Sequence, residues 1–420
     1  MANQDASFFM PVSESCIGTR ADLFFGLRGA SRFYNEVVVP GIAGVRFVRQ
    51  LSWAVAALSI SEQIKKPPVT IIANGIEALG SKLEWEINQN YSFRGMRAFK
   101  RYSDEWTFEK LSTRQGYVYV PYRVSTVRAL PQFTGLGMAL GGAFRYNDME
   151  LSEIGRDLAA VILDGKGGGK EKIRSFIVPW VRGVREIANK KALTYALSPS
   201  SPTVDEQKIV LNCLMTVVEL PFGLPNDAER RLRLVEFASV KQKIPFMDWL
   251  QVKNSLHAKQ VRVAQNFEEY RNAILNLYST CTNELSNIGA IGVEELVSRA
   301  PIDLAFQKLT DRAKIYTESA QDICPHSDAM LHAGNAQRGN NPAFLKELVQ
   351  LDDRILRLVD GKICKGALFR NMQNEIEDED GIADEDGSVQ ELGDAVEKFP
   401  HHRLAQFYAL LSDCGVGGGL

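Results

Sequence analysis

The stretch Val37-Val38-Val39-Pro40-Gly41-Ile42 leads through Arg46 and Arg49 into Leu51-Ser52-Trp53-Ala54-Val55-Ala56-Ala57-Leu58, the most apolar helical pattern in the chain. The Pro-Gly pair favours a turn, and the pattern over residues 43–66 predicts a helix that ends before Pro67-Pro68. Apolar residues cover most of the surface of this predicted helix, as is typical of a buried helix. We therefore expect the N-terminal part of the chain to pack around it.

Arg46, Arg49 and Trp53 lie at the entrance of this predicted helix. A guanidinium group at the end of a buried helix needs a carboxylate, carbonyl oxygens or a phosphate as its partner. A structural ion pair is one interpretation, with Glu77 or Glu84 of the next predicted helix as the partner. A binding site is the other interpretation, and the sequence leaves both open.

Helical patterns continue along the rest of the chain and predict a mainly α fold. Ser152 and Thr203 stand where helix caps are expected, and Glu206 completes a capping box with Thr203. The linker Ser198-Pro199-Ser200-Ser201-Pro202 predicts a boundary between an N-terminal helical domain, residues 1–200, and a larger α-helical bundle, residues 201–420. Residues 375–388 have the acidic composition of a disordered loop.

A small winged-helix-like unit is predicted near residues 93–165. Residues 116–122 are aromatic and β-branched, which favours a strand. Glycine-broken apolar residues then lead into Leu151-Ser152-Glu153-Ile154-Gly155-Arg156-Asp157-Leu158-Ala159. A hairpin that runs into such a helix is typical of the wing of winged-helix domains.

Charge is divided unevenly between the two halves of the chain. Residues 1–200 hold 26 Lys and Arg against 18 Asp and Glu, whereas residues 201–420 hold 23 against 33. An acidic partner such as DNA is therefore expected to meet the N-terminal half. The six cysteines form no CxxC pair and the N-terminus lacks the pattern of a signal peptide, which favours the cytoplasm, and no segment predicts a membrane span.

The clearest candidate contact for nucleic acid is a predicted helix whose basic residues fall on one face. These residues are Arg94, Arg97, Lys100 and Arg101, and Tyr91, Phe93 and Tyr102 flank them. Such a face contacts phosphates in many nucleic-acid-binding proteins. The alternative is a solvated helix face whose aromatic neighbours join the core.

No motif predicts catalytic residues, a metal site or a cofactor. In the glycine-rich stretch over residues 164–171, Asp164 stands at the first glycine position of a phosphate-binding loop and Glu171 at its final Ser or Thr position. The two Asp-Gly-Lys sequences, at Asp164 and Asp360, resemble half of a nuclease motif, but each is interpreted as the end of a helix. Cys324, His326 and His332 lack a fourth zinc ligand, and His401-His402 is interpreted as a cap of the last helix.

Pro40-Gly41-Ile42 with Arg46, Arg49, Ser52 and Trp53 resembles the opening of a loose group of uncharacterised bacterial proteins associated with anti-phage defence islands. The pattern from Leu151 to Ala159 and the ending over residues 401–413 are similar to theirs, whereas Gln50-Leu51 departs from their usual aromatic pair. The resemblance carries no catalytic residues. It implies a non-enzymatic subunit of a multi-protein system, which binds DNA or a partner protein encoded nearby.

Two alternatives remain open from the sequence. One is a nuclease, or another nucleic-acid enzyme, whose motif is too degenerate to recognise. The other is a winged-helix DNA-binding transcriptional regulator.

Overall fold

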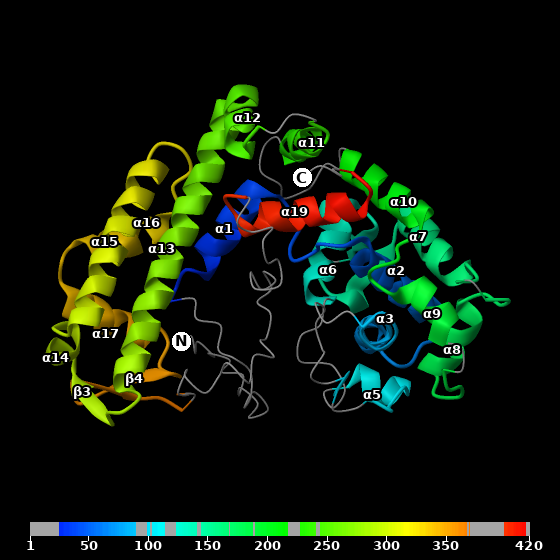
Figure 1. Cartoon of the computed structure of the whole chain (residues 1–420), viewed down its shortest axis with the longest axis horizontal. Helices are drawn as coiled ribbons and strands as arrows, with labels where there is room; N and C mark the ends of the chain where they lie inside the picture. Colours follow the sequence, from blue (N-terminus) through cyan, green and yellow to red (C-terminus); the bar gives the residue numbers. More distant parts are fainter. Residues whose placement is uncertain are drawn as a thin grey trace, which may run out of the picture.

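Helices form most of the regular structure in the computed structural model, which confirms the predicted mainly α class. Figure 1 shows two groups of helices with α19 lying between them. No helix of the described residues is long and apolar enough to cross a membrane. The structure describes residues 25–89, 99–100, 103–113, 123–140, 144–167, 169–187, 190–216, 227–240, 244–367, 369 and 399–416.

The first group of helices, the N-terminal lobe, is built around the predicted opening helix, α2. Trp53 of α2 is 2% exposed and packs so closely on α3 that a Cβ at Gly80 would lie 2.5 Å from its ring. The helices of this lobe are α2 (Val48–Gln63), α3 (Val69–Ile87), α5 (Phe108–Ser112), α6 (Arg123–Ala129), η2 (Leu130–Thr134), η4 (Tyr146–Asp148), α7 (Glu153–Asp164), α8 (Arg174–Val181), α9 (Lys190–Leu197) and α10 (Val204–Met215). A short antiparallel pair, β1 (Gly137–Ala139) and β2 (Met149–Leu151), precedes α7.

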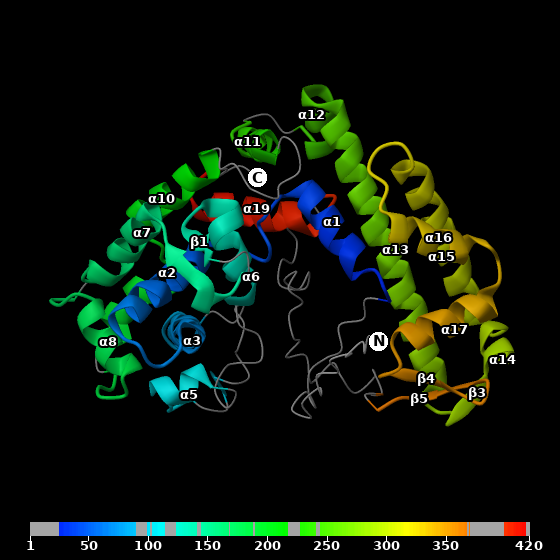
Figure 2. The ribbon, with the colours of Figure 1, turned by 180° about the vertical axis from the view of Figure 1, so that it is seen from behind.

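The second group, the C-terminal lobe, is built around the long helix α13. This helix packs most extensively against α15. Its helices are α12 (Phe246–Lys253), α13 (Ser255–Leu285), α14 (Val293–Val297), α15 (Ala300–Ala320), α16 (Ser327–Gln337) and α17 (Asn341–Leu351). Its strands are β3 (Ala290–Gly292), β4 (Leu356–Val359) and β5 (Lys362–Lys365), which form an antiparallel sheet in the order β3-β5-β4. Figure 2 shows this sheet at the foot of the lobe.

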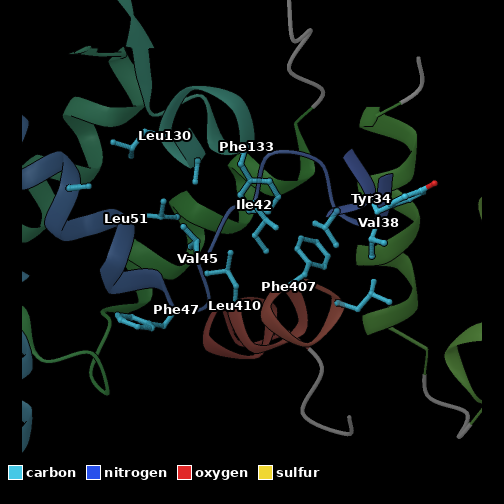
Figure 3. Close-up of a cluster of buried hydrophobic side chains, with 14 of the residues drawn as sticks. Tyr34, Val38, Ile42, Val45, Phe47, Leu51, Leu130, Phe133, Phe407 and Leu410 are labelled. Carbon is cyan, nitrogen blue, oxygen red and sulfur yellow. The ribbon is translucent and has the colours of Figure 1, made fainter. Parts of the chain in front are cut away.

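Three helices join the lobes and are called the junction below: α1 (Arg28–Val38), α11 (Asp227–Ala238) and α19 (His402–Asp413). The turn at Pro40-Gly41 carries the chain from α1 to α2 past α19. Figure 3 shows Ile42 and Val45 of this turn packed beside Phe407 and Leu410 of α19, and all four are fully buried. The opening stretch therefore lies where the two lobes meet.

Buried arginines of α11 reinforce the junction. The Arg230 guanidinium donates to Val37 O of α1 at 2.9 Å and to Gln260 Oε1 of α13 at 2.8 Å. Arg231 donates to Phe133 O of the N-terminal lobe at 2.6 Å. Both side chains are at least 93% buried, with exposed fractions of 7% and 5%. The partners of both arginines are distant in sequence, so a local sequence pattern does not predict these contacts.

Local predictions succeeded where the signal lay within one turn of helix. Ser152 Oγ accepts the Gly155 N–H at the start of α7, and Thr203 and Glu206 form the capping box of α10, so both predicted caps are confirmed. The prediction that Asp360-Gly361 ends a helix was wrong. These two residues have φ of 48° and 74° and form the tight turn of the β4–β5 hairpin.

Two predictions concern larger units, the winged-helix-like unit and the boundary between the two domains. A hairpin does lead into α7, but residues 116–122 and the whole acidic loop 375–388 lie outside the described ranges, so the winged-helix unit and the disordered loop stay predictions. The domain boundary at Ser198–Pro202 also stays a prediction. Helix α10, which follows this linker, packs against α7 and α2.

Candidate functional site

Of the predicted nucleic-acid contacts, only Lys100 lies within the described residues, and its side chain is exposed. Arg94, Arg97 and Arg101 lie outside them. The basic helix face therefore stays a prediction.

Arg49 is fully buried and forms an ion pair with Glu206 of α10, with 3.1 Å between Nη2 and Oε2. Arg49 Nη2 also donates to Tyr195 O at 2.9 Å and to Ser201 O at 2.6 Å. Burial lowers the pKa of Arg49, whereas the nearby carboxylates of Glu206 and Asp413 raise it. The predicted partners Glu77 and Glu84 were wrong for Arg49, because it reaches across the lobe to the capping residue of α10.

The neighbours of Arg49 serve the same packing. Trp53 Nε1 donates to Leu197 O at 2.9 Å, at the end of α9. Glu84 accepts hydrogen bonds from the hydroxyls of Ser198 and Ser200, which fixes the linker that follows α9. Arg46 is half-buried, and its backbone N–H donates to Gln50 Oε1 at 2.8 Å. This geometry assigns a structural role to Arg49 and Trp53.

A cavity of about 450 Å³ lies beside the Arg49–Glu206 pair. Its lining comes from four segments: Arg49 of α2, the end of α7 with the connector after it, the end of α9, and the linker that leads into the start of α10. Val161, Ile162 and Ala196 give it apolar walls. Lys166, which also lines the cavity, is exposed. A volume of this size is typical of sites for small molecules or for part of a larger ligand.

Exposed basic residues follow this cavity along the chain, in the segment from the end of α7 to the start of α9. Residues 165–191 contain eight Lys and Arg but only two Glu. Figures 1 and 2 both show α8 of this segment on the side of the lobe that faces away from α13. We call this surface the basic edge and define it by four exposed residues that form no ion pair with a described acidic residue: Lys166, Lys170, Arg182 and Lys191.

Sequence reasoning missed the basic edge although a signal for it was present. Averaging over a whole half of the chain hides this charge, whereas residues 165–191 alone carry a net charge of +6. A count in shorter windows would have found them. Their exposure required the structure, because Arg174 of the same segment is half-buried and pairs with Asp164 at 3.0 Å.

A second charged cluster lies in the junction, where α13 meets the start of α19. Glu268 Oε1 lies 2.8 Å from His402 Nδ1, and Glu268 Oε2 lies 3.5 Å from His401 Nε2. Burial raises the pKa of Glu268, but the two histidines outweigh this effect and lower the pKa to about 2. The three side chains therefore tie α13 to α19.

Glu268, His401 and His402 are close enough together to hold a metal ion, since their donor atoms lie within 4.8 Å of one another. No other such set occurs among the described residues. The hydrogen bonds argue against this use. His401 Nδ1 accepts the Arg403 N–H at 3.2 Å and caps α19, so a neutral ring carries its proton on Nε2. Nε2 would bind a metal only if His401 released the cap. The predicted cap at His401 is confirmed.

The other candidate motifs are occupied by structural contacts. Asp164 of the first Asp-Gly-Lys sequence pairs with Arg174. His332 Nδ1 lies 2.6 Å from the Tyr270 hydroxyl, and burial lowers the pKa of His332 to about 4. Burial raises the pKa of the Cys324 thiol to about 12, so Cys324 is a poor nucleophile and a poor metal ligand.

No family model, no curated protein and no solved structure matches the chain.

Proposed function

We propose that this protein is a non-enzymatic subunit that binds nucleic acid through the basic edge of its N-terminal lobe. The observation that carries the proposal is the exposure of Lys166, Lys170, Arg182 and Lys191, in a segment with eight basic and two acidic residues. Phosphates attract such a surface and release counterions when they bind it. The acidic C-terminal half, with 23 basic and 33 acidic residues, leaves the opposite side of the molecule free of this attraction.

Two further parts of the proposal rest on the sequence. The predicted basic helix at Arg94, Arg97, Lys100 and Arg101 is proposed as a second contact for nucleic acid. The resemblance to proteins of anti-phage defence islands favours a place in a bacterial multi-protein system, with a partner protein encoded nearby. A non-enzymatic role accords with the structural contacts of Asp164, His332 and the Glu268–His401–His402 cluster.

The test compares two variants that each remove four exposed positive charges. In the first, Lys166, Lys170, Arg182 and Lys191 are replaced by Ala. In the control, the same is done in the C-terminal lobe at Lys259, Arg262, Lys308 and Arg338, which are also exposed and form no ion pair with a described acidic residue. Affinity for a fluorescein-labelled 20-bp DNA duplex is measured by anisotropy across a series of salt concentrations.

Wild type is expected to bind with an affinity that falls steeply as salt rises. Because each phosphate contact contributes about 0.9 to the slope of log K against log salt, the loss of four contacts should reduce the magnitude of this slope by up to about 3.6. The control variant should retain the slope of wild type. Equal losses in the two variants would contradict the basic edge as the contact, and absence of binding by wild type at low salt would contradict the proposed function.

A further inference from the structure

The cavity beside Arg49 is electrically balanced, unlike the basic edge with which it shares Lys166. Arg49 and Lys166 bring two positive charges to its lining, and Asp205 and Glu206 bring two negative charges. A bare anion such as free phosphate gains little from a site of this kind, because the carboxylates offset the attraction of the cations. The ligand that suits the cavity is an uncharged group.

The deepest charged pair of the cavity leaves hydrogen-bonding groups unused. Arg49 Nε and Nη1 are buried donors that have no partner among the described residues, and Glu206 Oε1 is a buried acceptor that has none there either. Buried polar atoms are rarely left in this state, and each costs about 1–3 kcal/mol if it stays unpaired. A group that presents a carbonyl oxygen beside an N–H would supply both kinds of partner, and the edge of a nucleobase has this pattern.

The rim of the cavity suits a flat ring. Tyr195 lines the cavity and is 54% exposed, which leaves part of its aromatic surface open to solvent. Gly165 and Gly167 also line the cavity and bring no side chains into it. Gly167 has φ of +51°, and a Cβ there would lie 2.4 Å from Ala192 O, so a glycine is required at this position. Aromatic rings of this kind stack on the bases of single strands without regard to sequence.

We propose that the protein binds single-stranded nucleic acid, with one unstacked base in this cavity and the flanking phosphates on the basic edge. The inference rests on the proposed function and specifies its substrate. Lys166 connects the two parts, because it lines the cavity and belongs to the basic edge. A duplex keeps its bases stacked and paired, so it can use only the basic edge unless a base is flipped out.

The test measures the ratio of two affinities at one salt concentration. Anisotropy is recorded with a fluorescein-labelled 20-nucleotide single strand that lacks self-complementarity, and with the duplex formed from the same strand. We expect wild type to bind the single strand on the order of 10-fold more tightly than the duplex, the size that one base–aromatic stack supplies. Tyr195→Ala should remove this preference and leave the affinity for duplex unchanged.

Two further variants separate stacking from general damage. Tyr195→Phe retains the ring and should keep the preference for the single strand. Val184 follows Arg182 of the basic edge, is 75% exposed and does not line the cavity. Val184→Ala should therefore also keep the preference for the single strand. Both positions are exposed, so all three variants should fold like wild type.

The outcomes distinguish the inference from the function on which it rests. Equal binding of single strand and duplex by wild type, or a preference that survives Tyr195→Ala, would overturn the base site while leaving the basic edge in place. A parallel loss of both affinities in Tyr195→Ala would overturn it as well. Failure of wild type to bind either probe would overturn the proposed function, and the base site with it.

Discussion

Arg49 and Lys166 line the same cavity but lie in opposite environments. Arg49 is fully buried, and its guanidinium joins α2 to α10 through Glu206 and two backbone carbonyl groups. Lys166 is exposed and forms no ion pair with a described acidic residue. The first cation holds helices together inside the lobe, whereas the second lies at the surface.

This difference shows why a buried arginine such as Arg49 is a poor candidate for binding an anionic partner. A buried charge must be paired, so its energy is already committed to the fold. An exposed charge contributes little to folding, and its attraction for an anionic partner is retained. Stability should therefore depend on the buried charges of Arg49 and Glu268, and binding on the basic edge.

The largest effect is expected from Arg49→Met. This change leaves Glu206 buried without its cation, and breaking a buried pair in this way typically lowers the free energy of unfolding by about 3–5 kcal/mol. Urea denaturation followed by circular dichroism would measure the loss.

The double variant Arg49→Met with Glu206→Gln is the matched control. Gln keeps an oxygen that can accept the Thr203 N–H of the capping box but carries no charge. The double variant should therefore be more stable than Arg49→Met alone. If the second substitution adds its own full loss instead, the ion pair is not what Arg49 contributes.

A smaller loss is expected from Glu268→Ala in the junction. This change removes the acceptor that faces His401 and His402, and we expect the free energy of unfolding to fall by about 1–3 kcal/mol. Glu269→Ala offers a close comparison, since Glu269 is the next residue of α13 and pairs with the exposed Arg312. That surface pair is worth about 0–1 kcal/mol. Similar losses in the two variants would show that the cluster does not tie the lobes together.

The smallest effect concerns Asp413, which accepts the Val48 N–H at 2.7 Å at the start of α2. Burial raises the pKa of Asp413 from 3.8 to about 6, against the lowering effects of this hydrogen bond and of Arg49. Between these values the folded protein holds a proton that the unfolded chain has released. The contribution of Asp413 to stability is therefore greatest at low pH and declines as the pH rises towards 6.

Asp413→Asn removes this titration and supplies the test. The stability of wild type relative to the variant should decline from pH 4 to pH 7 by about 1 kcal/mol, less than a fully buried carboxyl group would give, because Asp413 is partly exposed. Urea denaturation at the two pH values gives the difference. A difference that does not change with pH, or that changes in the other direction, would contradict the buried, proton-linked role of Asp413.

The sequence by itself determined the features that depend on neighbouring residues. Helix patterns predicted the mainly α class, and the caps at Ser152, Thr203 and His401 were correct because a cap bonds within its own first turn. The apolar pattern around Trp53 predicted a buried helix for the same reason. The charge of residues 165–191 was also present in the sequence, although only a count in short windows reveals it.

Only the tertiary structure decided which distant residues meet. Arg49 pairs with Glu206, which is 157 positions away, and Glu268 meets His401 and His402, more than 130 positions away. A carboxylate in any of several helices satisfies the chemistry of such a group equally well, so the choice depends on how the helices pack. The cavity shared by Arg49, Lys166 and Tyr195 arises from the same packing, since its walls come from four segments of the chain.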